Sequence, residues 1–189
     1  MARLPKVTRE AVPEELREAF DEVVAANGGN MPGGPGSVTI NSPELARRRG
    51  AQSRYLRFET SIPPAIVELA MLTTARCMDC AYVWNAHLPE ARRAGVTEEV
   101  LLALRDDEPL PAAAGDEQSA VVEYGRELMR THKVGEGTFQ AALDAFGPQR
   151  LVEITAIMGL YAQNAFFLNA FAVDLPSDLA EPRLQGPRP

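Results

Sequence analysis

The stretch ELAMLTTARCMDCAYVWNAHLPEARRAGVTEEVLLAL, residues 68–104, carries the strongest structural and chemical signals in the chain. It holds both cysteines, the single tryptophan and one of the two histidines. Gly95 is typical of the residue that follows a helix end, and Thr97 followed by two glutamates is typical of a new helix start. The stretch therefore predicts helices joined by short turns and gathers the reactive side chains in one place.

The rest of the chain also predicts helices, and no convincing alternating strand pattern occurs. The Gly/Pro-rich residues 28–37 cannot continue a helix and are expected to form a connector or a lid, and Gly147-Pro148 is expected to break a helix. The predicted fold class is all-α. The expected helices cover residues 13–26, 42–48, a segment that starts at 61–64 and includes Glu68, 116–132 with Asp116 as its cap, 138–146 with Thr138 as its cap, and an apolar segment to about 173.

The 189 residues are expected to form one main helical unit with two flanking segments. Residues 1–38 would supply an N-terminal helix and the Gly/Pro-rich loop. Residues 39–176 would form the helical domain, and residues 177–189, rich in Pro and charge, would form a poorly packed tail.

Composition argues against several classes of protein. The net charge of −7 and the lack of a basic stripe argue against a nucleic-acid partner. Polar residues interrupt the apolar runs, so no membrane span is expected, and the first residues lack the apolar stretch of a secretory signal. We therefore expect a cytoplasmic protein, in which thiols stay reduced and a Cys-x-x-Cys pattern indicates redox or metal chemistry.

The reactive residues have helical spacing. Cys77, Cys80, Trp84 and His87 are separated by three, four and three residues, which would stack them on one face of a continuous helix. Glu68 precedes Cys80 by twelve residues, roughly 18 Å along a straight helix. If Glu68 belongs to the site, the backbone must break between them.

Asp79 is the residue expected to provide that break. As an N-cap it would place Cys80 in the first turn of the next helix, where the helix N-terminus favours a thiolate. We therefore expect Cys80 to be the more reactive thiol and Cys77 the less reactive one.

Simpler interpretations remain open at this level. Cys80 and Trp84 are also consistent with buried core residues, because free cysteine is among the most buried residue types. A structural zinc site would lack a fourth protein ligand, so no metal is expected. A Cys77–Cys80 disulfide would be strained within one helix, so it is expected only as a labile redox pair, and His132 is expected at the surface.

Two segments of the chain resemble each other. Val67-Glu68-Leu69 recurs as Val152-Glu153-Ile154, and Trp84-Asn85-Ala86 recurs as Leu168-Asn169-Ala170. A duplicated helical unit explains this, and so does chance likeness between two core helices. Only the first segment has Cys and His, so the reactive chemistry is expected there.

The spacing of these residues resembles a known family, the carboxymuconolactone decarboxylase / alkylhydroperoxidase-D-like (AhpD-like) family. The likeness covers residues 40–176, and residues 151–176 are similar to the closing helix of the family. The resemblance implies an all-helical fold that assembles into homo-oligomers, often trimers or hexamers. The motif consists of Glu68, eleven residues, Cys80, six residues, His87, then Ala91, Ala94-Gly95-Val96 and the Thr97 helix start.

The peroxidase branch of the family has a Glu, two cysteines separated by two residues, and a His four residues after the second cysteine. Glu68, Cys80 and His87 fall on three of these positions. Val83 occupies the position of the family's peroxide-attacking cysteine, and Cys80 matches its disulfide partner. The decarboxylase branch lacks the cysteines but has a His followed by an Ala/Gly-Val-Thr stretch, which residues 87–97 echo.

Three functions follow as hypotheses. The first is a thiol-dependent peroxidase, in which Cys80 is the thiolate, Cys77 the resolving thiol, His87 and Glu68 the proton relay, and a thiol compound the reductant. No cofactor is expected, and the pocket is expected to include Trp84, Tyr82 and Val83.

The second is a decarboxylase or isomerase of a small carboxylated lactone, with His87 as general acid/base and Arg76 or Arg92 as a carboxylate ligand. The third is a non-catalytic helical oligomer that binds a small molecule. Self-association is expected in each case, because residues 148–173 are apolar on more than one core-facing stripe.

Overall fold

The computed structural model describes residues 3–175 and residue 184, and within them it is helical and contains no strand. The predicted all-α class is therefore confirmed. The α-helices are α1 (Arg17–Ala26), α2 (Pro35–Thr39), α3 (Pro43–Phe58), α4 (Pro64–Cys77), α5 (Ala81–Arg93), α6 (Glu98–Arg105), α7 (Gly115–Thr131) and α8 (Glu136–Ala170), and the short 3-10 helices are η1 (Arg9–Ala11), η2 (Glu14–Leu16) and η3 (Ala112–Ala114).

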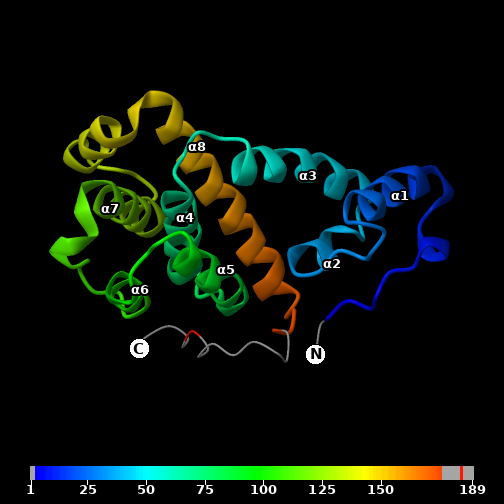
Figure 1. Ribbon diagram of the computed structural model, residues 1–189. Helices are drawn as coiled ribbons and strands as arrows, with labels where there is room; N and C mark the ends of the chain where they lie inside the picture. The colour runs from blue at the N-terminus through cyan, green and yellow to red at the C-terminus, as the bar shows by residue number, and fades with distance from the viewer. Residues whose placement is uncertain (1–2, 176–183, 185–189) are drawn as a thin grey trace.

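Helix α4 lies at the centre of the main core. It packs against α5, α7 and α8 (Figure 1), and its side chains from Leu69 to Ala75 are all buried. A helix that is surrounded by other helices needs apolar residues on its whole circumference, which explains the run of apolar and small residues in α4. The carboxylate of Glu68 therefore stands in an apolar setting.

A second, smaller core holds the N-terminal part of the chain. Val12, Phe20 and Ile40 form this cluster, in which α1 packs against α3 while α2 contacts α8. Figure 1 shows α3 running from the α4–α8 lobe toward α1 and α2. The gap between the two lobes is where the cleft described below is found.

Several boundaries differ from the predicted ones. Helix α3 continues to Phe58, beyond the predicted end near residue 48, because its Arg-rich second half has helix-forming residues but no apolar stripe to reveal it. The Gly/Pro-rich loop contains α2, which starts at Pro35 after Gly34, whose φ is +54°. Pro at the first helical position is favourable, so Pro35 was a signal for a helix start. The prediction missed this helix because the glycines around it indicated a loop.

The caps give a mixed outcome. The predicted helix start at Thr97 is confirmed, and Thr97 caps α6 with its Oγ1, which accepts from the Val100 amide at 3.4 Å. Asp116 was predicted to cap α7, which was wrong, because the helix starts at Gly115 and Asp116 lies in its first turn. His132 follows the end of α7 with a φ of +61°, at the exposed position expected for it.

Helix α8 is two helices joined at a kink. Gly147 has φ 70° and ψ 169°, so the predicted break at Gly147-Pro148 is confirmed. The helix is long and apolar enough to cross a membrane by length and composition, but 56% of its apolar window is buried inside the protein, as in a core helix. Of the predicted tail, residues 177–189, only Leu184 is among the described residues, and its side chain is buried.

Candidate functional site

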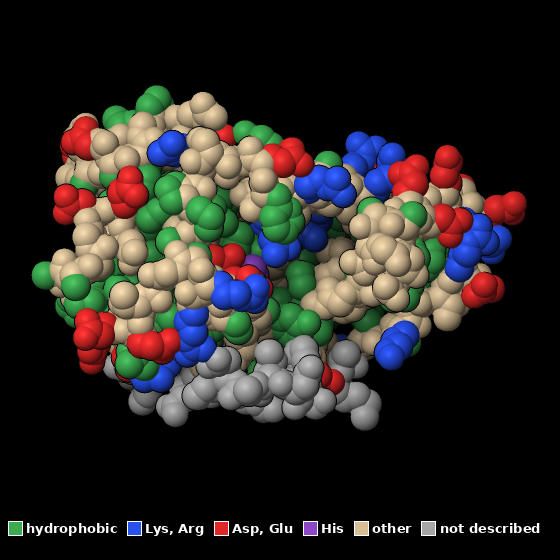
Figure 2. Space-filling view, viewed as in Figure 1, with side chains coloured by type: hydrophobic (Ala, Val, Ile, Leu, Met, Phe, Trp, Pro, Cys, Tyr) green, Lys and Arg blue, Asp and Glu red, His purple; other side chains and the backbone are tan. Residues whose placement is uncertain are grey.

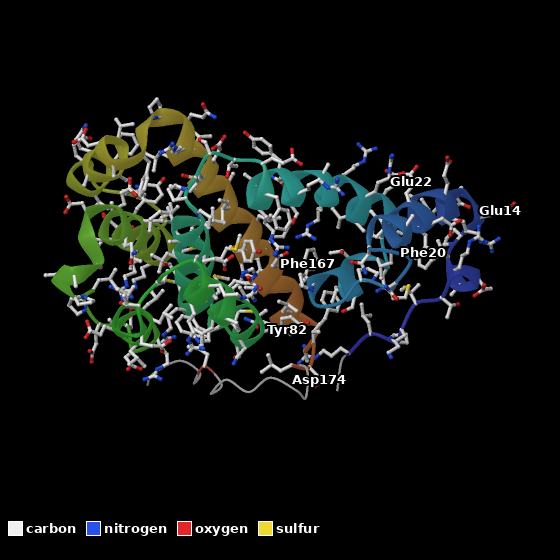
Figure 3. The ribbon with its side chains drawn as sticks, viewed as in Figure 1. Glu14, Phe20, Glu22, Tyr82, Phe167 and Asp174 are labelled. Carbon is white, nitrogen blue, oxygen red and sulfur yellow. The ribbon has the colours of Figure 1, made fainter. Side chains whose placement is uncertain are left out.

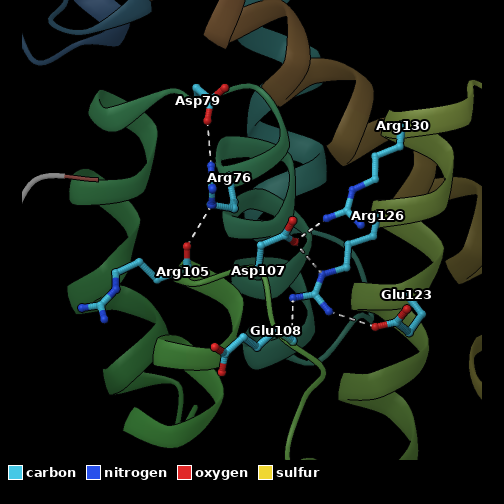
Figure 4. Close-up of polar contacts among 8 residues, drawn as sticks. All are labelled: Arg76, Asp79, Arg105, Asp107, Glu108, Glu123, Arg126 and Arg130. Carbon is cyan, nitrogen blue, oxygen red and sulfur yellow. Dashed lines mark hydrogen bonds and ion pairs between the residues drawn. The ribbon is translucent and has the colours of Figure 1, made fainter. Parts of the chain in front are cut away.

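The chain breaks between α4 and α5, as Glu68 and Cys80 required. Asp79 adopts a φ of +47°, and the Cys80 amide donates to the Ala75 carbonyl at 2.8 Å. The expected cap was wrong, however, because Cys80 itself is the N-cap of α5. The Asp79 carboxylate instead accepts from Arg76 Nη1 at 2.6 Å, as Figure 4 shows, and so stabilises the turn.

The turn brings Glu68 and His87 together. Glu68 Oε2 lies 2.9 Å from Nδ1 of His87, and the two side chains are only 14% and 11% exposed. An ionised carboxylate only accepts hydrogen bonds, so with Glu68 ionised this contact requires a proton on Nδ1 of His87. This leaves Nε2 as the nitrogen that can accept a proton, and no partner of Nε2 occurs among the described residues.

Tyr161 of α8 holds the other side of the imidazole. The rings of Tyr161 and His87 meet edge to face, with centroids 5.0 Å apart and an interplanar angle of 80°. Burial raises the pKa of the Tyr161 phenol well above its ordinary value, and nearby Glu68 adds to the rise. Tyr161 is therefore a neutral wall that fixes the ring plane of His87.

His87 and Tyr161 open onto a cleft of about 950 Å³. Its walls come from α1, α2, α3, α5, α8 and the loop before α2. Figure 2 shows basic side chains beside the hollow between the two lobes. Figure 3 labels Tyr82 of α5 and Phe167 of α8 near this gap. The residues that line the cleft include Glu22, Gly34, Arg47, Arg49, Arg54, Arg57, Tyr82, Val83, His87, Glu90, Tyr161 and Asn164.

Residues 43–124 match the model of the carboxymuconolactone decarboxylase family. The matched segment makes up less than half of the chain. It runs from the start of α3 into α7, so it contains both members of the Glu68–His87 pair. No curated protein matches the chain.

Solved structures share the fold at low identity. The alkylhydroperoxidase AhpD core of an uncharacterized peroxidase-related protein from Ralstonia eutropha JMP134 is 18% identical over 94% of each chain, with a TM-score of 0.70. A peroxidase-related protein from Silicibacter sp. TM1040 is 16% identical over 94% of this chain and 93% of that one, with a TM-score of 0.67. The debrominase Bmp8, in a cysteine-to-alanine variant complexed with 2,3,4-tribromopyrrole, is 14% identical over 94% and 95%, with a TM-score of 0.67. These matches establish an AhpD-like fold.

Within the matched segment, the two thiols lie away from the cleft. Cys80 is fully buried, and burial raises its pKa, although the amides of Val83 and Tyr82 act in the opposite direction. Cys77 is half-buried at the end of α4, where burial also raises its pKa against the opposing charge of Arg130. Both thiols are free, and neither lines the cleft.

The expected pocket residues divide into two groups. Tyr82 and Val83 line the cleft, whereas Trp84 is buried in the main core. Val83 precedes His87 by one helical turn, so the side chain that faces the cleft beside the imidazole is an isopropyl group. A fully buried Cys80 and a cleft-facing Val83 are what the altered family motif produces in three dimensions.

The proposed carboxylate ligands Arg76 and Arg92 are committed elsewhere. Arg76 bonds to Asp79 and donates to the Arg105 carbonyl at 2.8 Å, at the edge of the Arg126 and Arg130 network drawn in Figure 4. Arg92 pairs with Glu98. Neither arginine lines the cleft.

Sequence reasoning missed the walls that α3 and α8 contribute. Arg49 lies in a run of three arginines, and Tyr161 and Asn164 are polar positions three apart in an apolar helix, so a faint signal existed. The described residues contain no group of three or more His, Cys, Asp or Glu side chains that could hold a metal ion. The arrangement is therefore an acid/base pair at a basic cleft.

Proposed function

We propose that the cleft is an active site in which the Glu68–His87 pair moves a proton on a small-molecule substrate, as in a decarboxylase or isomerase. The observation that carries this proposal is the 2.9 Å contact between Glu68 and Nδ1 of His87, with Nε2 unpaired among the described residues on a cleft-lining ring. A carboxylate that fixes the tautomer of a histidine is a common support for general acid/base chemistry.

The chemistry follows from the two nitrogens of His87. In an isomerisation, Nε2 would take a proton from one substrate carbon, the electron pair of that C–H bond would shift within the substrate, and the imidazolium would return the proton to another atom. In a decarboxylation, the electrons of the broken C–C bond would stay on the substrate while CO₂ leaves, and His87 would supply the proton that replaces it. Glu68 would stabilise the imidazolium in both cases.

A thiol-dependent peroxidase is the second candidate. It is favoured by the amides of Val83 and Tyr82, which lower the pKa of Cys80 against the effect of burial. A Cys80 thiolate would attack the peroxide O–O bond and form a sulfenic acid, the hydroxyl leaving as water, and Cys77 would displace a second water to give a disulfide. This route needs Cys80 to become accessible to peroxide, which its full burial opposes.

The two candidates are separated by one set of assays. The protein is incubated with a panel of small carboxylated lactones in D₂O, and proton exchange and product formation are followed by NMR before and after alkylation with iodoacetamide. We expect turnover that alkylation does not reduce and that His87→Gln abolishes. Peroxide consumption with dithiothreitol, lost on alkylation, would instead establish the peroxidase, and neither activity would indicate a binding protein.

We also propose that the chain self-associates, as a trimer or hexamer, in the cytoplasm. The support is the exposure of large apolar side chains on α8, with Val152 70% and Phe166 63% exposed. Light scattering at micromolar concentration measures the mass directly, and a monomeric mass would contradict this.

A further inference from the structure

Arg49 is a half-buried cation on the wall of the cleft. Its Nε donates to Gln163 Oε1 at 2.7 Å, its Nη2 donates to Asn164 Oδ1 at 2.6 Å, and its guanidinium stacks on Phe167 with 5.2 Å to the ring centroid. All three partners belong to α8, so the arginine is fixed in place from across the cleft. Burial lowers its pKa, as expected for a charge that has lost part of its hydration.

No carboxylate of the described residues neutralises this charge. Both partners of Arg49 are neutral amide oxygens, and a guanidinium carries five N–H donors, so three remain without a partner in the described part of the chain. The N–H groups left over are those of Nη1 and the second one of Nη2, which lie side by side at the end of the guanidinium. Two parallel donors of this kind can bind the two oxygens of one carboxylate. A charge that is partly removed from water normally has a partner, and a bound anion would supply the counter-ion that Arg49 lacks among the described residues.

Arginines outnumber acidic residues among the charged residues that line the cleft. Arg54 and Arg57 line it and form no ion pair among the described residues. The two lining acids, Glu22 and Glu90, are paired with Arg47 and Arg93 respectively. Glu68 lies behind His87 and is bonded to it. The cleft is thus cationic in a protein of net charge −7, which attracts small anions locally and argues against a neutral substrate.

We propose that Arg49 is the residue of this cleft that binds the substrate, and that its free N–H groups take a carboxylate of that substrate. The inference rests on the proposed function for the role of the site, but binding can be tested without turnover. Asn164 and Gln163 act as positioning residues that hold the fork of Arg49, and Phe167 covers its face.

The test uses benzoate as the probe, with benzamide as its neutral isostere and phenylphosphonate as a tetrahedral anion. Binding is measured by isothermal titration calorimetry. We expect benzoate to bind at millimolar concentration or below, benzamide not to bind, and Arg49→Gln to weaken benzoate binding roughly ten- to hundredfold. The matched control is Arg48→Gln, because Arg48 is exposed, pairs with Glu44 and lies outside the cleft, so benzoate affinity should not change.

Two further variants keep the result interpretable. Arg49→Lys keeps the charge but not the fork, and should weaken benzoate binding less than Arg49→Gln, with circular dichroism confirming the fold of both. His87→Gln should abolish turnover but keep benzoate binding, which separates failure of the acid/base proposal from failure of this one. Unchanged benzoate affinity in folded Arg49→Gln, equal binding of benzamide, no binding to the wild-type protein, or tighter binding of phenylphosphonate would each overturn the carboxylate assignment.

Discussion

Helices α4 and α8 each bury a glutamate in an almost identical local sequence, yet the two carboxylates have different surroundings. Glu68 in Val67-Glu68-Leu69 contacts His87 at 2.9 Å beside the cleft. Glu153 in Val152-Glu153-Ile154 accepts from the hydroxyl of Tyr55 at 2.6 Å and from Gln149 at 3.1 Å. One carboxylate faces an imidazole, and the other faces a phenol and an amide.

The difference shows that the partner decides the role of a buried carboxylate. An imidazole gains and loses a proton near neutral pH, so its neighbour can assist proton transfer. The two partners of Glu153, the Tyr55 phenol and the Gln149 amide, do not change charge near neutral pH. The role of Glu153 is therefore to anchor α3 to α8. We therefore assign chemistry to the first segment and structure to the second.

The largest expected effect comes from Glu68→Gln. Gln keeps the volume of Glu68 but removes the charge that fixes the His87 tautomer and stabilises the imidazolium. Turnover in the lactone assay should fall about 10²- to 10⁴-fold while circular dichroism stays unchanged.

Glu153→Gln is the internal control for this comparison. It makes the same chemical change in the matching sequence context, but far from His87, so turnover should stay within about twofold of wild type. Comparable loss of turnover in both variants would remove the distinction between the two segments.

Thiol labelling is expected to give the next largest effect. It reports on the first segment alone, because both cysteines lie there. Cys77 is half-buried and Cys80 fully buried, so iodoacetamide should label Cys77 about tenfold faster or more, reversing the order expected from the sequence. Burial raises both pKa values, so the thiolate is scarce at neutral pH and labelling should quicken by ~tenfold per pH unit up to the raised pKa.

Peptide mapping after limited alkylation measures both rates. Val83→Cys is the positive control, since it places a thiol on the cleft wall beside His87 and should label faster than Cys80. Preferential labelling of Cys80 in the wild-type protein would restore it as the leading nucleophile.

Local sequence signals predicted the fold class and the central turn correctly. Proline and glycine fixed the start of α4 and the kink at Gly147, because these residues act through their own backbone geometry. The need for a break between Glu68 and Cys80 followed from helix dimensions alone, and the structure has that break. Asp79 was given the wrong role there, because an alternative partner, Arg76, lies three residues before it.

The walls of the cleft could not be predicted in the same way. Arg49 meets Asn164 across 115 residues of sequence, and Tyr161 meets His87 across a helix packing interface. Such contacts depend on how the helices pack, and no spacing rule within one helix reveals them. The closeness of Gly34 to Tyr82 depends on packing too, since nothing local links the Gly/Pro-rich loop to α5.

The closeness of Gly34 to Tyr82 gives a third prediction, because it places the Gly/Pro-rich loop against the first segment. Tyr55, which bonds to Glu153 in the second segment, is exposed instead. A Cβ added at Gly34 would lie 3.1 Å from the Tyr82 ring, and the φ of +54° disfavours any L side chain. Gly34→Ala should therefore lower the free energy of unfolding by about 1–2 kcal/mol. It should also weaken benzoate binding, because Gly34 and Tyr82 both line the cleft.

Gly50→Ala is the matched control in α3. Nothing lies within 4 Å of a Cβ there and the residue is helical, so Ala should stabilise the protein by about 0.5–1 kcal/mol. Urea unfolding of both variants measures the two effects. Equal stabilities would show that the loop does not rest on α5.

The smallest expected effect concerns Glu153 itself. The hydrogen bond and charge of Glu153 raise the pKa of the Tyr55 phenol, so the folded protein holds that proton more tightly than the unfolded chain. This contribution to stability is fully present below the ordinary tyrosine pKa near 10 and is lost as the pH rises through the raised value. Glu153→Gln removes the charge but keeps an acceptor, so the Tyr55 pKa should fall toward its ordinary value while stability at pH 7 changes little. Tyrosine absorbance titration measures the shift, with Tyr55→Phe identifying the signal. An unchanged titration in Glu153→Gln would mean that Glu153 does not hold Tyr55, and the structural role of the second carboxylate would have to be abandoned.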